Sequence, residues 1–125
     1  MIKGLGIDII EIGRIESLLK TRGEAARKRL FTPHELACCG RAVHRLAGRF
    51  AAKEAFFKAL GTGLRRYNWQ EIEVHNDPLG APHFQFSPRV QAYLAEKGVT
   101  KTHLTIAHSK EYAVAQVILE GDEEE

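Results

Sequence analysis

The chain has 125 residues, of which 44% are hydrophobic and 27% charged, a balance that is typical of one folded domain and excludes a disordered chain. No apolar run is long enough to span a membrane, and Asp8 interrupts the apolar N-terminus, which lacks the cleavage site of a signal peptide. Cys38 and Cys39 are adjacent, so they form neither a disulfide framework nor a zinc knuckle, and a reducing cytoplasm is the expected location.

Charge is distributed unevenly along the chain, although the net charge is only +2. Residues 1–66 carry a balance of +8, whereas residues 67–125 carry a balance of −6. The basic first half predicts an acidic or phosphorylated partner, without indicating which one. The sequence Gly-Asp-Glu-Glu-Glu at 121–125 is expected to form a solvated tail after a single domain at 1–120.

The first half of the chain has the pattern of one strand followed by helices. Isoleucines dominate the first segment, and apolar residues then recur at helical spacing until Gly23. Thr32, Pro33 and Glu35 have the pattern of a helix start with a capping box. The predicted elements are a strand at 2–10, a helix at 11–22, a basic helical turn at 24–31, a short helix ending at Cys39 and a long helix at 42–60.

The second half consists mostly of predicted strands. Alternating apolar and polar residues, Asn-Asp-Pro and Gly-Ala-Pro turns, and a Ser-Pro helix start define its segments. They are a strand at 69–75, a turn, a strand at 82–86, a helix at 87–97 and two strands joined in a hairpin at 109–111. This order predicts an α+β fold with one long central helix, and further helices, packed on a mostly antiparallel sheet.

The long helix carries a carboxylate within an otherwise apolar stripe. At about 100° per residue, Glu54 lies between Phe50 and Phe57 on one side of this helix. A solvated Glu54, or one paired with Lys58 at i+4, is the ordinary interpretation of a mid-helix glutamate. The apolar neighbours favour another interpretation, because a buried carboxylate without a partner is costly and should meet a cation.

A second unusual carboxylate lies in the first strand. Alternation places Gly4, Gly6 and Asp8 on one face, where the two glycines leave room for something to approach the backbone. Aspartate is disfavoured in strands, although Asp8 could instead cap the next helix near Glu11. Together, Asp8 and Glu54 suit Mg²⁺, which proteins usually hold with one or two carboxylates while substrate phosphates and waters complete the octahedron.

Basic and small residues near these carboxylates suit a substrate that carries phosphate. Basic side chains of the long helix could reach anionic oxygens, and the glycines after it would let the backbone approach a ligand closely. His108, at a predicted strand end, could donate to a phosphate or simply face solvent in the hairpin. The residues concerned are Arg45, Arg49, Lys53, Lys58, Gly61, Gly63, His108 and Ser109.

Four motifs also carry a family resemblance. They are GLGIDIIEIGRIE at the N-terminus, RFAAKEAFFKALGTG in the middle, EVHNDPLGAPHF, and LTIAHSKEYAVAQVILE near the end. In this order, from residue 2 to 120, they resemble holo-acyl-carrier-protein synthase, the small bacterial family of 4′-phosphopantetheinyl transferases. The resemblance implies an enzyme that moves the 4′-phosphopantetheine group of coenzyme A onto a serine of apo acyl carrier protein and releases adenosine 3′,5′-bisphosphate.

The resemblance further implies roles for individual residues. Asp8 and Glu54 match the family's Mg²⁺ ligands, with Mn²⁺ as an alternative ion, and Lys58 matches a catalytic lysine at the pyrophosphate. The other matches are Arg45, Arg49 and His108 near the 3′-phosphate of coenzyme A, Lys53 and Ser109 beside the coenzyme, and Arg14 toward the acidic carrier protein, with Arg22 extending that surface. A homotrimer with active sites between subunits is implied as well. The proton of the attacking serine would pass to Glu54 or to a metal-bound water, and the sequence leaves both routes open.

Two other functions fit parts of the pattern. A nucleic-acid-binding module would use the basic helices at 14–29 and would need exposed stacking aromatics or a recognition-helix motif. Neither is visible in the sequence, and Phe50, Phe56 and Phe57 are expected in the core or in contacts between subunits. A catalytically inactive trimeric scaffold is the second alternative. The sequence therefore favours the enzyme, with coenzyme A and a carrier protein as partners and without binding to nucleic acid or membrane.

Overall fold

The computed structural model describes residues 1–61 and 67–123, so Gly63, a predicted coenzyme-binding residue, lies outside the described residues. The elements are β1 (Ile2–Glu11), α1 (Ile12–Leu30), α2 (Pro33–Cys39), α3 (Val43–Leu60), the 3-10 helix η1 (Trp69–Glu71), β2 (Ile72–Asn76), β3 (Pro82–Phe86), α4 (Pro88–Glu96), β4 (Val99–His108) and β5 (Tyr112–Gly121). Their order is the one expected from the sequence, and the α+β class is confirmed.

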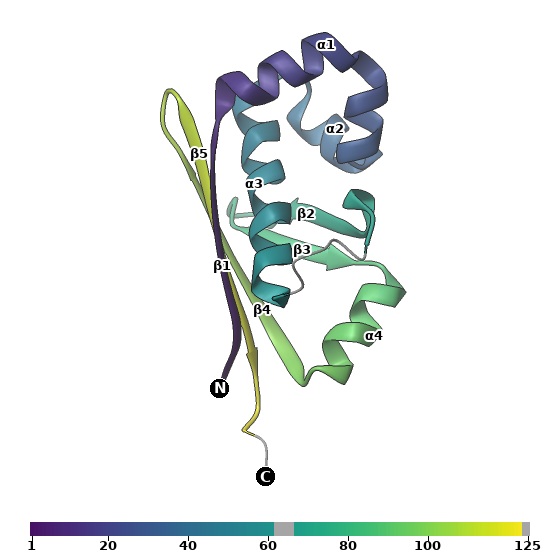
Figure 1. The fold of residues 1–125 in the computed structure, drawn as a ribbon, viewed down its shortest axis with the longest axis vertical. Helices are drawn as coiled ribbons and strands as arrows, with labels where there is room; N and C mark the ends of the chain where they lie inside the picture. The colour runs from purple at the N-terminus through teal and green to yellow at the C-terminus, as the bar shows by residue number, and fades with distance from the viewer. Residues whose placement is uncertain (62–66, 124–125) are drawn as a thin grey trace.

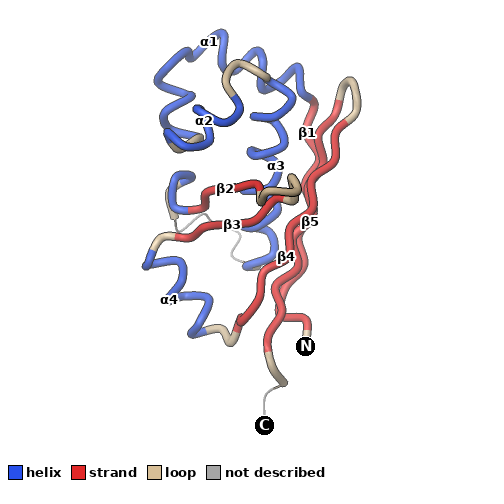
Figure 2. Tube along the Cα trace, turned by 180° about the vertical axis from the view of Figure 1, so that it is seen from behind, coloured by secondary structure: helices blue, strands red, loops and turns tan. Residues whose placement is uncertain are grey.

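Two antiparallel sheets organise the fold. The larger sheet has the strand order β1-β5-β4, and the smaller one is the hairpin β2-β3. The helices all lie on one side of the larger sheet, with α3 running along it and α1 and α2 near one end (Figure 1). The view from behind places the smaller sheet and α4 on this same side (Figure 2). The opposite side of the larger sheet is therefore left uncovered by the described chain.

The first helix is interrupted where the sequence predicted its end. Helical geometry stops at Gly23, where φ is 61° and ψ is −144°, and the basic helical turn predicted at 24–31 follows it, so that α1 consists of two helical parts joined by a kink. Glycine adopts such a conformation at little cost. Ala26 and Leu30, beyond the kink, are buried, so packing of this basic segment explains why the helix continues.

Two boundaries in the second half also differ from the prediction. Trp69–Glu71 is a 3-10 helix instead of the start of a strand, because the Glu71 carboxylate accepts the Asn68 N–H at 2.8 Å in a capping box. β5 extends to Gly121, the first residue of the predicted tail. The Gly121 N–H donates to the carbonyl of Met1 at 2.9 Å, so that residue belongs to the sheet end.

Two glycines bring β1 very close to α3. A Cβ atom built at Gly4 would lie 2.2 Å from the carbonyl oxygen of Ala59, and one at Gly6 would lie 1.9 Å from that of Ala55. Any side chain larger than hydrogen would therefore separate the strand from the helix. The sequence predicted that something approaches this backbone, and the structure shows that it is α3.

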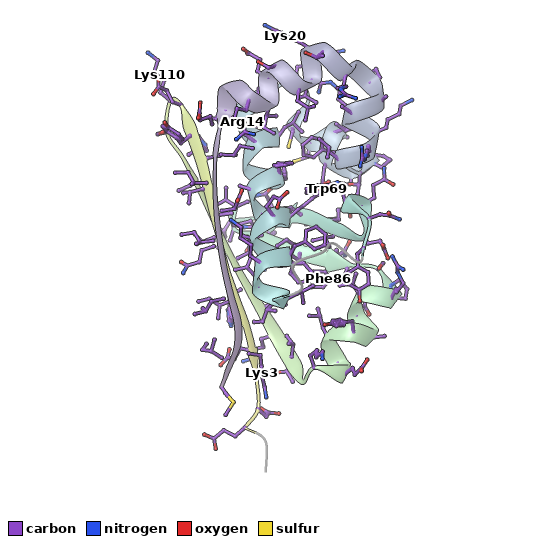
Figure 3. The ribbon with its side chains drawn as sticks, in the orientation of Figure 1. Lys3, Arg14, Lys20, Trp69, Phe86 and Lys110 are labelled. Atoms are coloured by element: carbon purple, nitrogen blue, oxygen red, sulfur yellow. The ribbon has the colours of Figure 1, made fainter. Side chains whose placement is uncertain are left out.

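The remaining sides of α3 pack into an aromatic core. Phe56 is fully buried, with its ring centroid 5.4 Å from that of Phe84 and 4.9 Å from that of Phe86. Phe50 stacks on Trp69 at 5.0 Å between centroids, and Figure 3 shows Trp69 and Phe86 beside α3. The aromatic side chains expected in the core are thus engaged there. Within 1–61 and 67–123, no helix combines the length and the apolar character that crossing a bilayer requires.

The face of the larger sheet that points away from the helices is apolar and exposed. Leu5, Ile7 and Ile9 of β1 are 61%, 59% and 65% exposed, and they alternate along the strand with Gly4, Gly6 and Asp8, whose face meets α3. Strand pairing places them beside three residues of β5. We call this surface the outer face and define it by Leu5, Ile7, Ile9, Tyr112, Val114, Gln116 and Ile118. An exposed apolar surface of this kind commonly marks a contact with another chain.

Gly6→Ala should destabilise the protein by at least about 2 kcal/mol, since the new methyl group would meet backbone atoms that cannot move aside. Urea unfolding followed by circular dichroism measures the effect. Gly13→Ala is the matched control, because nothing lies within 4 Å of its added Cβ and the residue is helical. That change should be neutral or stabilise by up to about 1 kcal/mol. Equal effects of the two substitutions would contradict the close contact of β1 with α3.

Candidate active site

The contact between β1 and α3 brings together two predicted site residues, the carboxylate of Asp8 and the ammonium of Lys58. The Lys58 ammonium lies 3.0 Å from Oδ1 of Asp8 and also donates to the carbonyl of Ile7 at 3.1 Å. Asp8 is the next inward-facing residue of β1 after Gly6, so the close glycine contact sets its distance from the helix. The Asp8 side chain is 15% exposed and that of Lys58 is 55% exposed, which leaves the lysine accessible to a substrate.

Asp8 does not cap the following helix. The N-cap residue of α1 is Glu11, which makes no capping hydrogen bond through its side chain, and Asp8 takes Lys58 as its partner. The capping interpretation of Asp8 is therefore wrong. Glu54 lies one helical turn before Lys58 in α3 and is partly buried. We call Asp8, Glu54 and Lys58 together the carboxylate group.

The number and type of ligands in the carboxylate group decide which divalent ion it suits. Among residues 1–61 and 67–123, no three or more His, Cys, Asp or Glu side chains are arranged to hold a metal. A pair of carboxylates without a third protein ligand does not suit structural zinc, which needs four protein ligands. It does suit Mg²⁺, which keeps several positions for water and substrate phosphates. The donor chemistry of Asp8 and Glu54 therefore fits the ion expected from the sequence.

A second group of predicted ligand residues faces α2 and β2. Arg49 is 6% exposed, donates to the side-chain oxygen of Asn76 and has its Nη2 3.8 Å from Sγ of Cys38. Arg45, one turn earlier, is exposed and donates to the carbonyl of Cys38 at 3.3 Å. We call Arg45, Arg49, Asn76 and Cys38 the arginine cluster. Nε of Arg49 is buried and has no hydrogen-bond partner in the described part of the chain, so an external acceptor would complete the cluster.

Lys53 has an environment that differs from the prediction. Its ammonium is fully buried and lies 2.6 Å from the Glu35 carboxylate. It also donates to the carbonyl oxygens of Leu30 at 2.9 Å and Trp69 at 3.1 Å. Burial lowers the pKa of Lys53, and the nearby Glu35 carboxylate opposes this shift. All three ammonium hydrogens are engaged within the protein, so the expectation that Lys53 binds the coenzyme is corrected.

Three other predicted coenzyme residues lie at the ends of elements. His108 ends β4 and is exposed, with its ring centroid 5.0 Å from that of His44 in the first turn of α3. Ser109 follows it in the hairpin, where its Oγ accepts the Tyr112 N–H at 3.3 Å. Gly61 caps α3 with φ of 72°, as the glycine stop predicted. Their positions leave them accessible, and coenzyme binding by these residues stays a prediction.

Within one chain, the two groups of ligand residues point to different sides of α3. Arg49 and Glu54 are five residues apart, which corresponds to a rotation of about 140° around the helix axis. Lys58 borders β1 through Asp8, whereas Arg49 borders α2 and β2. The Asp8–Lys58 pair and the arginine cluster therefore lie on different sides of α3.

The two predicted carrier-binding arginines line a single hollow. Arg14 and Arg22 are exposed on α1, and Figure 3 shows Arg14 near the start of this helix. They border an open hollow of about 620 Å³, together with the apolar side chains of Ile10, Leu18 and Phe50. Apolar lining with cations beside it suits a partner surface that combines acidic and apolar residues.

Comparison with known proteins defines the family. A sequence profile of the 4′-phosphopantetheinyl transferase superfamily matches residues 4–117. The holo-[acyl-carrier-protein] synthase of Trichlorobacter lovleyi is 48% identical, over 97% of this chain and 99% of that protein. The chain therefore belongs to the 4′-phosphopantetheinyl transferase superfamily. Within it, the similarity to the holo-acyl-carrier-protein synthases indicated by the sequence motifs is confirmed.

Solved structures agree with this placement. The holo-[acyl-carrier-protein] synthase of Neisseria meningitidis has a TM-score of 0.89 and 40% identity, covering 96% of this chain and 99% of that one. A holo-(acyl-carrier-protein) synthase of Bacillus anthracis, solved in complex with CoA (3′,5′-ADP), has a TM-score of 0.78 and 42% identity. The alignment covers 98% of this chain and 99% of that one. The fold and the order of the motifs are therefore shared over nearly the whole chain.

Sequence reasoning missed two residues that the structure places beside predicted ligands. Glu35 forms the predicted capping box with Thr32, at 2.9 and 3.1 Å, but it also accepts the Lys53 ammonium. Asn76 has the pattern of a turn residue, yet its side chain accepts from Arg49. In the sequence, the capping box explains Glu35 and the turn explains Asn76, so no pattern indicated that either side chain has a further partner.

Proposed function

We propose that this protein transfers the 4′-phosphopantetheine group from coenzyme A to a serine of an apo acyl carrier protein. The observation that carries the proposal is the Asp8–Lys58 pair, built by β1 and α3 with Glu54 one helical turn before Lys58, in a chain of this family. The serine oxygen forms a bond to the phosphorus that bears pantetheine, and the bond from this phosphorus to the bridging oxygen of the pyrophosphate breaks. Adenosine 3′,5′-bisphosphate leaves, and the serine proton passes to a base.

Asp8 and Glu54 would hold a divalent ion, Mg²⁺ by preference and Mn²⁺ as an alternative. When bound, the ion would offset the negative charge of the pyrophosphate. Lys58 keeps its ammonium accessible beside Asp8 and would stabilise the charge that develops on the leaving phosphate. Glu54 is the proposed acceptor of the serine proton, either directly or through a water molecule.

The arginine cluster would bind the nucleotide end of coenzyme A, which carries several phosphate groups. The buried Nε of Arg49 lacks an acceptor among the described residues, and a phosphate oxygen could supply one. Arg45 is exposed beside it and would add a second guanidinium. His108 is the proposed third donor to the 3′-phosphate. Contacts of Ser109, Gly61 and Gly63 with the coenzyme are proposed on the family match and on their position at element ends.

Association of three chains would complete the site. The carboxylate group and the arginine cluster lie on different sides of α3 in one chain, and the outer face is apolar and uncovered. We propose a homotrimer that buries the outer faces and places active sites between subunits. The hollow beside Arg14 and Arg22 would receive the acidic carrier protein. The cytoplasm is the proposed location.

Incubation with coenzyme A, Mg²⁺ and apo carrier protein should add the mass of phosphopantetheine to the carrier, as read by mass spectrometry. Asp8→Asn and Glu54→Gln should each lower the transfer rate by roughly a hundredfold or more, because each removes the negative charge of a metal ligand. Their circular dichroism spectra should stay unchanged. Chelation should stop transfer by the wild type, and added Mg²⁺ should restore it.

Glu96→Gln is the matched control for these two variants, because it removes an exposed carboxylate at the end of α4 and should leave the rate unchanged. Absence of the mass shift with the wild-type protein would overturn the proposed function. Near-normal turnover of Asp8→Asn would overturn the assignment of the metal ligands while leaving the transfer reaction in place.

Arg14→Glu and Arg22→Glu should each raise the KM for the carrier protein about tenfold and leave the KM for coenzyme A unchanged, because they reverse charge only at the carrier surface. Higher salt should raise the KM of the wild type for the carrier protein and so reduce the difference in this KM between the wild type and the two variants. Steady-state kinetics at two salt concentrations measures both effects. Lys97→Glu, an equal charge reversal at the end of α4, is the control, and an equal rise in its KM would argue against a specific docking surface.

Ile7→Lys should convert the trimer to monomers, because it places a charge in the centre of the outer face. Analytical ultracentrifugation measures the mass of the assembly. Leu79→Lys is the matched control, since Leu79 is 96% exposed at the turn between β2 and β3 and is not part of the outer face. A trimeric Ile7→Lys variant, or dissociation caused equally by Leu79→Lys, would refute this use of the outer face.

A further inference from the structure

A buried ion pair joins helix α3 to helix α2. The Lys53 ammonium and the Glu35 carboxylate are 2.6 Å apart, and both side chains are 0% exposed. Lys53 also donates to the carbonyl of Leu30 at 2.9 Å, at the end of α1, and to that of Trp69 at 3.1 Å, at the start of η1. The ammonium therefore connects α3 to three other segments of the chain.

The carboxylate of this pair is equally engaged. Its Oε1 accepts the N–H of Thr32 at 2.9 Å, and its Oε2 accepts the N–H of Val74 in β2 at 2.9 Å. With the Lys53 ammonium, Glu35 has three donors from three places in the chain. Hydrogen bonds of this kind fix direction as well as distance, which apolar contacts do not.

The arginine cluster is built from the same elements that this pair joins. Arg49 lies one helical turn before Lys53 in α3. Cys38 lies three residues after Glu35 in α2. Asn76 lies two residues after Val74 of β2, whose N–H donates to Glu35. A shift of α2 or β2 relative to α3 would therefore separate the Arg49 guanidinium from both of its neighbours.

We propose that Lys53 and Glu35 are positioning residues for the binding of coenzyme A. The pair fixes α2 and β2 against α3, so that the arginine cluster holds its guanidinium groups in place for the phosphates of the nucleotide. This inference rests on the proposed function and deepens it, because neither side chain reaches the surface or touches the substrate. Lys53 thus acts through Arg49.

A purely stabilising role is the alternative explanation. Removing two charges from water is costly, and replacing both members of a buried pair by neutral residues is often neutral or stabilising, whereas removing one member is strongly destabilising. A stabilising role and a positioning role for the pair therefore predict different results when both Glu35 and Lys53 are replaced by neutral residues. If the pair only stabilises the fold, neutralising both charges should restore coenzyme binding together with thermal stability.

The test compares Glu35→Gln, Lys53→Met and the double variant, each assayed below its melting temperature with coenzyme A and with 3′-dephospho-coenzyme A. Each should raise the KM for coenzyme A about tenfold, with kcat and the KM for carrier protein within about threefold of the wild type. The loss with 3′-dephospho-coenzyme A should be smaller, because the arginine cluster then has one phosphate fewer to bind. Calorimetric titration with coenzyme A should show the same weakening without turnover. The double variant should melt higher than Lys53→Met and still bind coenzyme A weakly.

Leu94→Ala is the control for lost stability, because Leu94 is buried in α4, far along the chain from the residues of the arginine cluster. This substitution should lower the melting temperature without changing the KM for coenzyme A. Wild-type KM for coenzyme A in the double variant, or equal losses with and without the 3′-phosphate, would overturn the positioning role. A wild-type protein that transfers nothing would instead overturn the proposed function, so the two failures are distinguishable.

Discussion

The contact of β1 with α3 through two glycines is the constraint on which the candidate active site depends. Gly4 and Gly6 let the strand backbone reach the helix backbone, and alanines at Ala55 and Ala59 leave the helix narrow at this point. Because nothing separates the two elements, the next inward residue of the strand, Asp8, meets side chains of the helix directly. The proposed catalytic chemistry therefore depends on the two glycines, which have no side chain to separate β1 from α3, as well as on the charged residues.

Adjacent residues of α3 serve two different environments. Lys53 and Glu54 are neighbours in sequence, but a helix turns about 100° between them. Lys53 consequently points into the protein interior, where it pairs with Glu35, while Glu54 lies on the same side of α3 as Lys58. A single helix thus carries one member of a buried ion pair, a carboxylate with a proposed role in the reaction and a guanidinium with a proposed role in substrate binding, and each points in a different direction around the helix axis.

Local signals in the sequence were sufficient for most of the fold. Caps, glycines and alternation located nearly every element, and strand alternation placed Asp8 on the inward face. They were insufficient where a long-range contact decided the outcome. The motif suggested that Lys53 meets the coenzyme, yet its partner Glu35 lies in another helix, and periodicity does not report contacts across the core.

The uncovered outer face has a consequence for how the protein folds. A monomer must present a row of leucine and isoleucine side chains to water, so part of the hydrophobic driving force becomes available only when chains meet. In the proposed homotrimer, mass action would couple the folding equilibrium to protein concentration. Dilution would weaken the fold itself, and the apparent melting temperature would rise with the logarithm of the amount of protein in the cell or the cuvette.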